Sequence, residues 1–527
     1  MAIASTSEKG HPNCVWEEPL KESSDNLIWL NLKNIYRQNG KEKTEKIILE
    51  ICTKETPEYL FVYDSMYYDL NLLSLLTKLK TLSPKTKSVL ISGDDDLTFY
   101  KIRYLAIFFD YVFVGQNDYI KKYEEDGLKN TKFIIVIKPV KEKTDYEKKY
   151  DVSLIASPKA DRVKWIEFLI KNNINISVFG IPNWNDYPTV KNNYKGLLSF
   201  QDRIKTTCQS KINICFSKNQ LNIPHHTGGF YESSLCKAFS IVEYAPQLEA
   251  LFKENKEIIF FRNEKELIEK IKYYLTHEKE RKEITKNAYE KIIKDFNFDI
   301  QLSNFIKETK GKFCQNNIPK QNKAIININK KLMNLPKKQL FEKIKNYDYI
   351  TFVDNPKLQS KYKETLQVYS LEKNNKEISC CDYFLHSNSI GTYAQFSFVP
   401  WGNFPGRDYQ SLLNPNQIMV TKNFFINNYE TIKENYKNKT ANFVNKNNTA
   451  FVSIPLVKIS KFKKNFFNHP EFKKELSLIN FSFHRKFYAL KRNPIKLLIY
   501  ALLLIKEILT GKNFLYSQLK IKLKIIT

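Results

Sequence analysis

The segment YDVSLIASPKADRVKWIEFLIKNNINISVFG, Tyr150–Gly180, has two short apolar runs on either side of a longer amphipathic stretch. Residues 151–157 and 176–180 are predicted to be buried strands, and residues 162–173 between them are predicted to form a helix. A strand, a helix and a second strand in this order favour parallel strands covered by the helix. The segment therefore predicts an α/β fold.

The same alternation continues in both directions along the chain. Further strands are predicted downstream at 212–217, 239–244 and 257–261, followed by charged helices at 264–277 and 279–296. Upstream, strands are predicted at 58–65, 88–96, 111–116 and 132–140, with helices at 69–82 and 117–127. Two Rossmann-like units in tandem place a ligand cleft between them, at the carboxyl ends of their strands.

These patterns divide the chain into five parts. We predict a first Rossmann-like unit over 1–145, a second over 146–306, a Lys-, Asn- and Gln-rich linker over 307–339, an additional α/β region over 340–460 and a basic helical tail over 461–527.

A net charge of +28 favours a polyanionic partner such as nucleic acid, an anionic membrane or a phosphorylated substrate, although a composition rich in Lys, Asn and Ile alone explains part of it. Residues 451–527 carry 16 Lys or Arg residues against 3 Asp or Glu residues. They also contain the apolar run Leu497–Ile505, which is too short to span a bilayer. An interfacial helix on the anionic membrane surface and a buried helix are both open interpretations, whereas no nucleic-acid-binding motif is present.

Eight cysteines form no CxxC pair and no Cys/His cluster with metal-ligand spacing. We therefore expect a reduced compartment and no bound metal. The amino-terminal residues lack the pattern of a signal peptide, so the expected location is cytoplasmic.

The stretch PHHTGGFYESSLCKAFSIVEY, Pro224–Tyr244, joins a polar loop to a helix and a strand. Glycines let backbone amides approach a ligand, and a helix N-terminus suits a phosphate. Glu232, expected in the first helical turn, either binds sugar hydroxyls or only stabilises the helix dipole. The loop residues are His225, His226, Thr227, Gly228 and Gly229.

This stretch and further motifs along the chain carry a family resemblance. The chain resembles CgeB-like (spore-maturation-type) glycosyltransferases of the GT-B fold in four segments: Gly228–Ile284, Tyr150–Gly180, YKGLLSFQDRIKTTCQSKINICFS and ISGDDDLTFYKIRYLAIFFDYVFVGQNDYIKKYEEDG. The resemblance covers about residues 26–305. It implies a nucleotide-diphosphate sugar as donor substrate, held by the second unit, with no cofactor required.

The resemblance also suggests roles for single residues. Glu232 aligns with the glutamate that binds the donor ribose, and Glu243 aligns with a second family acid. Arg162, Lys211 and Lys218 are candidates for the diphosphate, although strand-end lysines in a Lys-rich chain are often only solvated. Family members often carry Arg where this chain has Thr227, Gly228 and Gly229. We therefore expect backbone amides, or His225 and His226, to bind the phosphate.

The first unit departs further from the family. Its opening residues are polar and show no first strand, so we expect the first sheet element to be missing and leave the acceptor site and catalytic base open. The candidates for catalysis are His226 and the cluster Asp94, Asp95 and Asp96, which ends a predicted strand. Such a cluster can bind a divalent metal ion, supply a general base or cap a helix, and its place within the GT-B match argues against the metal.

The segment YDYITFVDNPKLQSKYKETLQVYSL faintly resembles family-2-like glycosyltransferases of the GT-A fold, with Asp354, Asn355 and Pro356 in place of the metal-binding acids. We interpret the region 340–460 as a degenerate, acceptor-binding module.

The predicted function is a glycosyltransferase that moves a sugar from a nucleotide-sugar donor to a surface polysaccharide or lipid-linked glycan, as in capsule or lipooligosaccharide synthesis, at the inner face of the cytoplasmic membrane. The alternatives are a noncatalytic membrane-associated scaffold and a transferase of a phosphorylated group onto a glycan.

Overall fold

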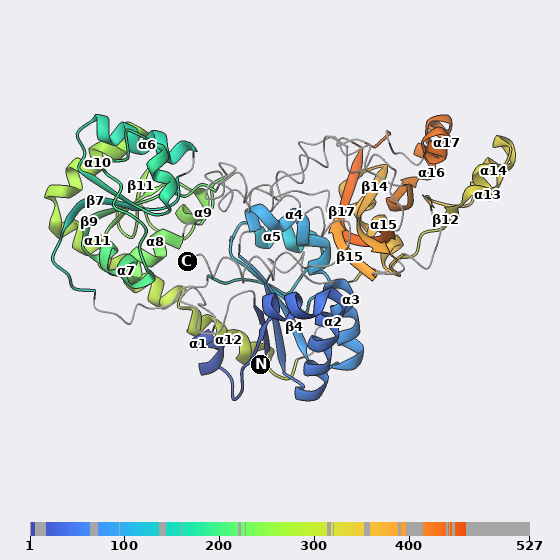
Figure 1. Ribbon diagram of the computed structural model, residues 1–527, viewed down its shortest axis with the longest axis horizontal. Coiled ribbons are helices and arrows are strands. Elements are labelled where there is room, and N and C mark those ends of the chain that lie inside the picture. Colours follow the sequence, from blue (N-terminus) through green and yellow to red (C-terminus); the bar gives the residue numbers. More distant parts are fainter. Residues whose placement is uncertain are drawn as a thin grey trace, which may run out of the picture.

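Three β-sheets organise the chain in the computed structural model (Figure 1). We call the parts built around them the first, second and third units. The structure describes residues 2–5, 17–63, 72–93, 95–135, 144–158, 160–219, 223–226, 228–312, 318–319, 321–352, 359–387, 391–396, 415–438, 441, 443–444 and 448–459. The predicted tail at 461–527 and the motif Asp354, Asn355 and Pro356 lie outside these residues.

The first unit is a parallel six-stranded sheet in the order β2-β1-β3-β4-β5-β6. Its central strands carry apolar residues on both faces, as in VLI of β4, and β4 is buried at every position. The strands are β1 (Ala2–Ser5), β2 (Ile28–Asn31), β3 (Tyr59–Tyr63), β4 (Lys87–Ser92), β5 (Tyr111–Val114) and β6 (Thr131–Phe133). The helices are α1 (Glu17–Glu22), α2 (Leu32–Glu55), α3 (Leu72–Leu82), α4 (Asp95–Ala106) and α5 (Tyr119–Glu125).

The prediction that the first sheet element is missing is wrong. Strand β1 lies between β2 and β3, and Ala4 pairs in parallel with Leu30 on one side and Val62 on the other. The strand has only four residues and is followed by a polar stretch, so its apolar pattern is too short to identify it. Its place is set by its neighbours in the sheet.

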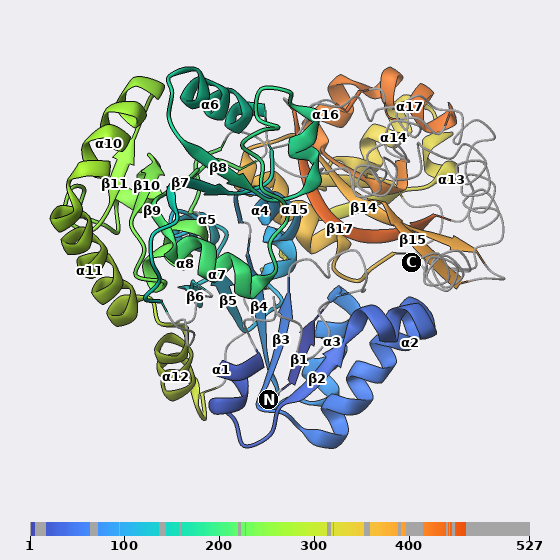
Figure 2. The same cartoon turned by 60° about the vertical axis from the view of Figure 1, so that its left-hand side comes forward.

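The second unit is a parallel five-stranded sheet in the order β11-β10-β9-β7-β8. Helices lie on both of its faces, so the two predicted Rossmann-like units are confirmed (Figure 2). Its strands are β7 (Tyr150–Ile155), β8 (Ile176–Phe179), β9 (Ser210–Cys215), β10 (Ser240–Glu243) and β11 (Ile259–Phe261). Its helices are α6 (Ala160–Lys171), η2 (Pro182–Asp186), α7 (Phe200–Cys208), α8 (Gly228–Leu235), α9 (Pro246–Glu249), α10 (Glu264–Thr276) and α11 (Glu278–Asp295).

Helix α12 (Phe298–Thr309) carries the chain back to the first unit, where it lies beside α1 (Figure 1). Its buried Phe305 packs edge-on against Tyr111 and Phe113 of β5. At its end, the hydroxyl groups of Thr309 and Tyr59 are 2.7 Å apart. The first two units are therefore joined by this helix as well as by the chain between their sheets.

The third unit is a mixed sheet in the order β12-β13-β16-β14-β15, with β17 paired in parallel to β14. Strand β12 (Ile325–Ile328) and helix α13 (Lys330–Met333) lie within the stretch 307–339 predicted as a linker. Three of the four residues of β12 are isoleucines, which favour a strand, and β12 pairs with β13 at the sheet edge. Its strands are β12, β13 (Tyr349–Phe352), β14 (Ile378–Ser387), β15 (Gly391–Phe396), β16 (Ile418–Thr421) and β17 (Thr449–Ile459). Its helices are α13 (Lys330–Met333), α14 (Lys337–Ile344), α15 (Lys363–Asn374), η4 (Pro415–Gln417), α16 (Lys422–Asn427) and α17 (Tyr429–Asn438).

The third unit shares one hydrophobic core with the first unit. Helix α4 lies against β17, and α15 is close by (Figure 2). The Tyr369 hydroxyl of α15 donates to the Asp126 carbonyl oxygen at 2.6 Å, and Tyr362 packs edge-on against Phe108 with ring centroids 4.9 Å apart. These two units therefore pack as one body. Among the described residues, no helix combines the length and apolarity needed to cross a bilayer.

Candidate functional site

The first and second units meet where the carboxyl ends of β4, β5 and β9 face one another. The loop after β5 supplies Gln116 and Asn117, and helix α4 after β4 supplies Asp96. The opposing residues follow β9 and include Asn219, His225 and His226. Parallel strands end at the same sheet edge, so each unit presents polar loops to the other.

Asp96 connects the two units. Its side chain is buried, and its Oδ2 accepts a hydrogen bond from Asn219 Nδ2 and lies 3.2 Å from His225 Nδ1. Its other oxygen, Oδ1, is buried and has no hydrogen-bond partner among the described residues. A buried carboxylate oxygen without a donor is costly, so this oxygen is suited to receive a hydroxyl from a bound molecule.

Asp95, the adjacent residue, has a different role. Its Oδ2 accepts from the backbone amides of Gly115 at 2.8 Å and Gln116 at 3.1 Å, and its Oδ1 accepts from the Tyr123 hydroxyl at 3.3 Å. These contacts fix the loop after β5 within the first unit. Asp94 lies outside the described residues, so Asp96 is the member of the predicted acidic cluster that the structure places at the interface.

His226 is fixed at the interface by three hydrogen bonds. Its backbone amide donates to Gln116 Oε1 at 2.8 Å, its Nε2 donates to Asn117 Oδ1 at 3.0 Å, and its Nδ1 accepts from the Tyr231 hydroxyl at 3.0 Å. Burial, assisted by the neighbouring His225, lowers the pKa of His226 to about 3. A neutral imidazole with both nitrogens engaged is a weak base, so this geometry favours a structural role over the predicted catalytic one.

His226 gives a pH prediction. Because its pKa falls from 6.5 to about 3 on folding, the unfolded chain binds a proton in this range that the folded chain does not. Stability is therefore lost as pH falls from 6.5 towards 3, by about 1.4 kcal/mol per pH unit at the steepest. Chemical denaturation of the wild type and of His226→Gln at several pH values measures this contribution as the difference between the two slopes. Equal slopes would contradict the assignment.

Glu243, Lys218 and Arg162 meet at the carboxyl edge of the second sheet. Glu243 is buried; its Oε2 accepts from the Ser217 amide at 3.1 Å, and its Oε1 lies 2.6 Å from Lys218 Nζ. Arg162 donates to the Lys218 carbonyl oxygen at 3.4 Å. Desolvation lowers the pKa of Arg162, and the negative charge of Glu243 opposes this shift. The structure thus brings together two cations and a carboxylate from three neighbouring elements.

Glu232 lies in the second turn of α8, because the helix begins at Gly228. The prediction of a first-turn position is therefore wrong. Arg203 Nη2 of α7 donates to Glu232 Oε1 at 2.9 Å, and the Glu232 side chain is 47% exposed. Gly228 and Gly229 are the exposed first residues of the helix, and Thr227 lies outside the described residues.

Lys211 is the predicted site residue that the structure places elsewhere. It is the second residue of β9, at the amino end of the strand, and its Nζ lies 2.7 Å from Asp151 Oδ1. Lys218 follows the carboxyl end of the same strand. Four further residues of the site have no local sequence pattern, because their partners lie on other elements: Arg203, Asn219, Gln116 and Asn117.

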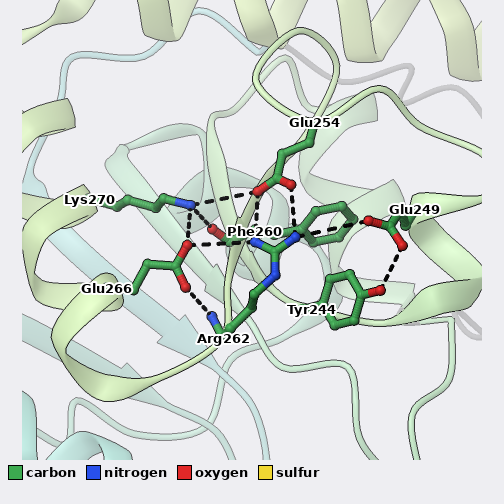
Figure 3. A network of polar contacts seen from close by, with 7 residues as sticks. All are labelled: Tyr244, Glu249, Glu254, Phe260, Arg262, Glu266 and Lys270. Carbon is green, nitrogen blue, oxygen red and sulfur yellow. Dashed lines mark hydrogen bonds and ion pairs between the residues drawn. The ribbon is translucent and has the colours of Figure 1, made fainter.

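A second polar cluster lies at the carboxyl end of the edge strand β11 (Figure 3). Arg262 donates to both carboxylate oxygens of Glu254, at 2.9 and 2.8 Å, and its guanidinium lies over the Tyr244 ring. These hydrogen bonds hold the pKa of Glu254 below its ordinary value. Lys270 and Glu266 of α10 complete the network, which satisfies its charges internally and fixes the end of β11.

Residues 162–307 match a family described as glycosyl transferase-like. No curated protein sequence matches the chain. Among the described residues, no group of His, Cys, Asp and Glu could hold a metal ion.

Several solved structures are similar to the chain at low sequence identity. TarM from S. aureus is 11% identical with a TM-score of 0.40, and the match covers 51% of this chain and 59% of TarM. HepE from Anabaena, solved in complex with UDP and glucose, is 11% identical with a TM-score of 0.43 and coverages of 59% and 99%. A sucrose-phosphate synthase from Thermosynechococcus elongatus is 12% identical with a TM-score of 0.42 and coverages of 58% and 98%.

The match over residues 162–307 includes Arg162, Lys218 and Glu243 at the carboxyl edge of the second sheet, and Glu232 of α8. Most of the second unit is therefore similar to the class of protein that the sequence predicts, in a chain that contains two Rossmann-like units.

Proposed function

We propose that this chain is a GT-B glycosyltransferase that binds a nucleotide-diphosphate sugar between its first and second units. One observation carries the proposal: the glycosyl transferase-like segment holds its polar residues at the sheet edge that faces the buried Asp96. Ligands of open parallel sheets bind at this edge.

The donor would bind mainly to the second unit. Arg162 and Lys218 supply positive charge for the diphosphate, and the amino end of α8 presents the backbone amides of Gly228 and Gly229. Glu232 is exposed enough to accept hydrogen bonds from ribose hydroxyls. The positive charge would also stabilise the nucleoside diphosphate as it leaves, when its negative charge grows.

Asp96 is the proposed general base. Its unpartnered Oδ1 would accept the proton that an acceptor hydroxyl loses as the new bond to the anomeric carbon forms. His225 and Asn219 hold Oδ2, so the free oxygen has a fixed position. This arrangement requires the second unit to be in place, because both of these partners come from its loops.

The acceptor would be a surface polysaccharide or a lipid-linked glycan at the inner face of the cytoplasmic membrane. This part of the proposal rests on sequence, since 16 Lys or Arg residues and the apolar run Leu497–Ile505 in residues 451–527 suit an anionic lipid surface.

A ligand screen tests the donor site. We expect one class among UDP-, GDP-, ADP-, CMP- and dTDP-sugars to raise the melting temperature of the full chain, because a ligand that binds only the folded state stabilises it. Glu232→Ala should remove this shift, whereas Glu283→Ala, an exposed carboxylate on α11, should keep it. Calorimetry then measures the affinity. A shift of equal size in all three proteins would overturn the role of Glu232.

A further inference from the structure

Helices α13, α14, α16 and α17 form one layer at the outer end of the third unit, opposite α10 and α11 of the second unit (Figure 1). We call these four helices the outer layer. Phe341 of α14 packs edge-on against Tyr429 of α17, with ring centroids 5.3 Å apart. Lys422 Nζ, at the start of α16, donates at 2.9 Å to the carbonyl oxygen of Lys345, which follows α14. The helices that follow β12 and β16 are therefore neighbours on one surface.

The outer layer has a local excess of positive charge. Its four helices contain eight lysines and three glutamates, whereas the whole second unit, residues 146–306, contains 25 Lys or Arg residues and 20 Asp or Glu residues. The excess is largest over residues 330–345, which contain six lysines and one acid. A Lys-rich composition would affect both units alike, so it does not explain this difference.

Most of the cations of α13 and α14 have no acidic partner. Lys337 lies 3.5 Å from Glu430 of α17, and Lys345, after α14, pairs with Glu342. The other lysines of these two helices are exposed and form no ion pair among the described residues: Lys330, Lys331, Lys338 and Lys343. Exposed like charges without counter-charges create a positive field above this surface.

An anionic membrane is the partner that suits this field. Strand β17 pairs with β14 and ends at Ile459, so the basic residues 461–527 follow directly from the third unit. A surface and a segment of the same sign in one unit favour one extended anionic partner over a small ligand. Single-stranded nucleic acid would also need aromatic rings that stack on bases, whereas Phe341 and Tyr429 pack on each other.

We propose that the outer layer docks on an anionic membrane through Lys330, Lys331, Lys338 and Lys343. This inference rests on the membrane location proposed above and adds a contact surface that does not involve residues 461–527. It directs the third unit, and not α10 and α11, towards the lipid.

Flotation of the full chain with lipid vesicles tests this surface. The vesicles contain phosphatidylcholine with or without phosphatidylglycerol. We expect the wild type to float with the anionic vesicles and not with the neutral ones. The combined change Lys330→Gln, Lys331→Gln, Lys338→Gln and Lys343→Gln should weaken this binding at least about tenfold, because each basic residue near an anionic leaflet contributes to it.

Two matched variants separate the position of the charges from their number. Lys265→Gln, Lys272→Gln, Lys279→Gln and Lys294→Gln together remove the same charge from exposed positions of α10 and α11, and should leave binding within about twofold of the wild type. Arg at the four outer-layer positions keeps the charge and should bind like the wild type. If the four Gln changes prevent folding, those at Lys338 and Lys343 are tested alone, and binding should still fall severalfold.

Four results would overturn the surface. Equal binding by the wild type and the outer-layer Gln variant would point to residues 461–527, which are unchanged in both, and would leave the membrane location intact. An equal loss in the α10 and α11 variant would show that only net charge matters. A wild type that does not bind anionic vesicles would overturn the membrane location as well, whereas donor binding would be unaffected. Tighter binding of single-stranded DNA than of vesicles, lost in the same outer-layer variant, would identify nucleic acid as the partner instead.

Discussion

Asp96→Asn is expected to lower the rate of sugar transfer by about 100- to 10,000-fold, the usual contribution of a general base. The amide retains an acceptor for Asn219 Nδ2 but cannot take a proton from the acceptor hydroxyl. Donor affinity should change little, because the proposed donor contacts belong to the second unit. Steady-state rates and calorimetric donor binding measure the two effects separately.

Two matched variants test this assignment. Asp95→Asn should act on stability, because Asp95 Oδ2 accepts from two backbone amides that an Asn side chain satisfies less well. Asp118→Asn, which changes an exposed carboxylate near the same interface, should leave both rate and stability close to wild type. An Asp96→Asn enzyme with full activity would exclude Asp96 as the base.

Phe108→Ala is expected to destabilise the first and third units together, by about 3–5 kcal/mol. Phe108 follows α4 in the first unit, is buried, and packs edge-on against Tyr362 of the third unit. Because both units share one core, the cavity should raise amide hydrogen exchange in β13 and α15 as well as in β3 and β4. Exchange measured by mass spectrometry reports each of these segments.

A core variant of the second unit serves as the control. Phe239 is buried in the separate core of that unit, with its ring centroid 4.8 Å from that of Tyr274. Phe239→Ala should raise exchange in β9 and β10 and leave α15 protected. If Phe108→Ala left the exchange of α15 unchanged, the first and third units would not be one body.

The shared core changes how the third unit is understood. The sequence favoured a module of its own over 340–460, because strand-like runs resume there after a polar stretch. In the structure, α4 lies against β17, and Tyr369 donates to the Asp126 carbonyl oxygen at 2.6 Å. Such contacts join residues more than 200 positions apart, so no local pattern in the sequence reveals them.

Most of the first two sheets could be predicted from the sequence, because their central strands are continuous apolar runs between amphipathic helices. The predicted strand at 176–180, for example, is β8, which is buried at every position. Strand β1 was missed because four residues carry too little pattern. The start of α8 was placed too late because Gly228 and Gly229, typical loop residues, begin the helix.

The sequence indicated several residues of the candidate site, but it did not indicate where each of them lies. The family resemblance suggested Arg162 and Lys218 for the diphosphate and aligned Glu243 with a family acid, and in the structure these three side chains lie at one sheet edge. Spacing could not separate Asp95 from Asp96, because adjacent residues on a helix point in different directions and only the packing of the units shows which one faces the interface. Lys211, the other lysine suggested for the diphosphate, is separated from this edge because it lies at the opposite end of β9 from Lys218.

The most direct test of the account is ³¹P NMR of the full chain with the nucleotide sugar that the screen identifies and a lipid-linked glycan acceptor. The account predicts that the nucleoside diphosphate accumulates as the sugar is transferred, and that Asp96→Asn suppresses it. For a nucleoside-diphosphate sugar as donor, accumulation of the nucleoside monophosphate would instead indicate transfer of a phosphorylated sugar. A donor that binds and is never consumed by any acceptor would contradict the assignment of this chain as a transferase.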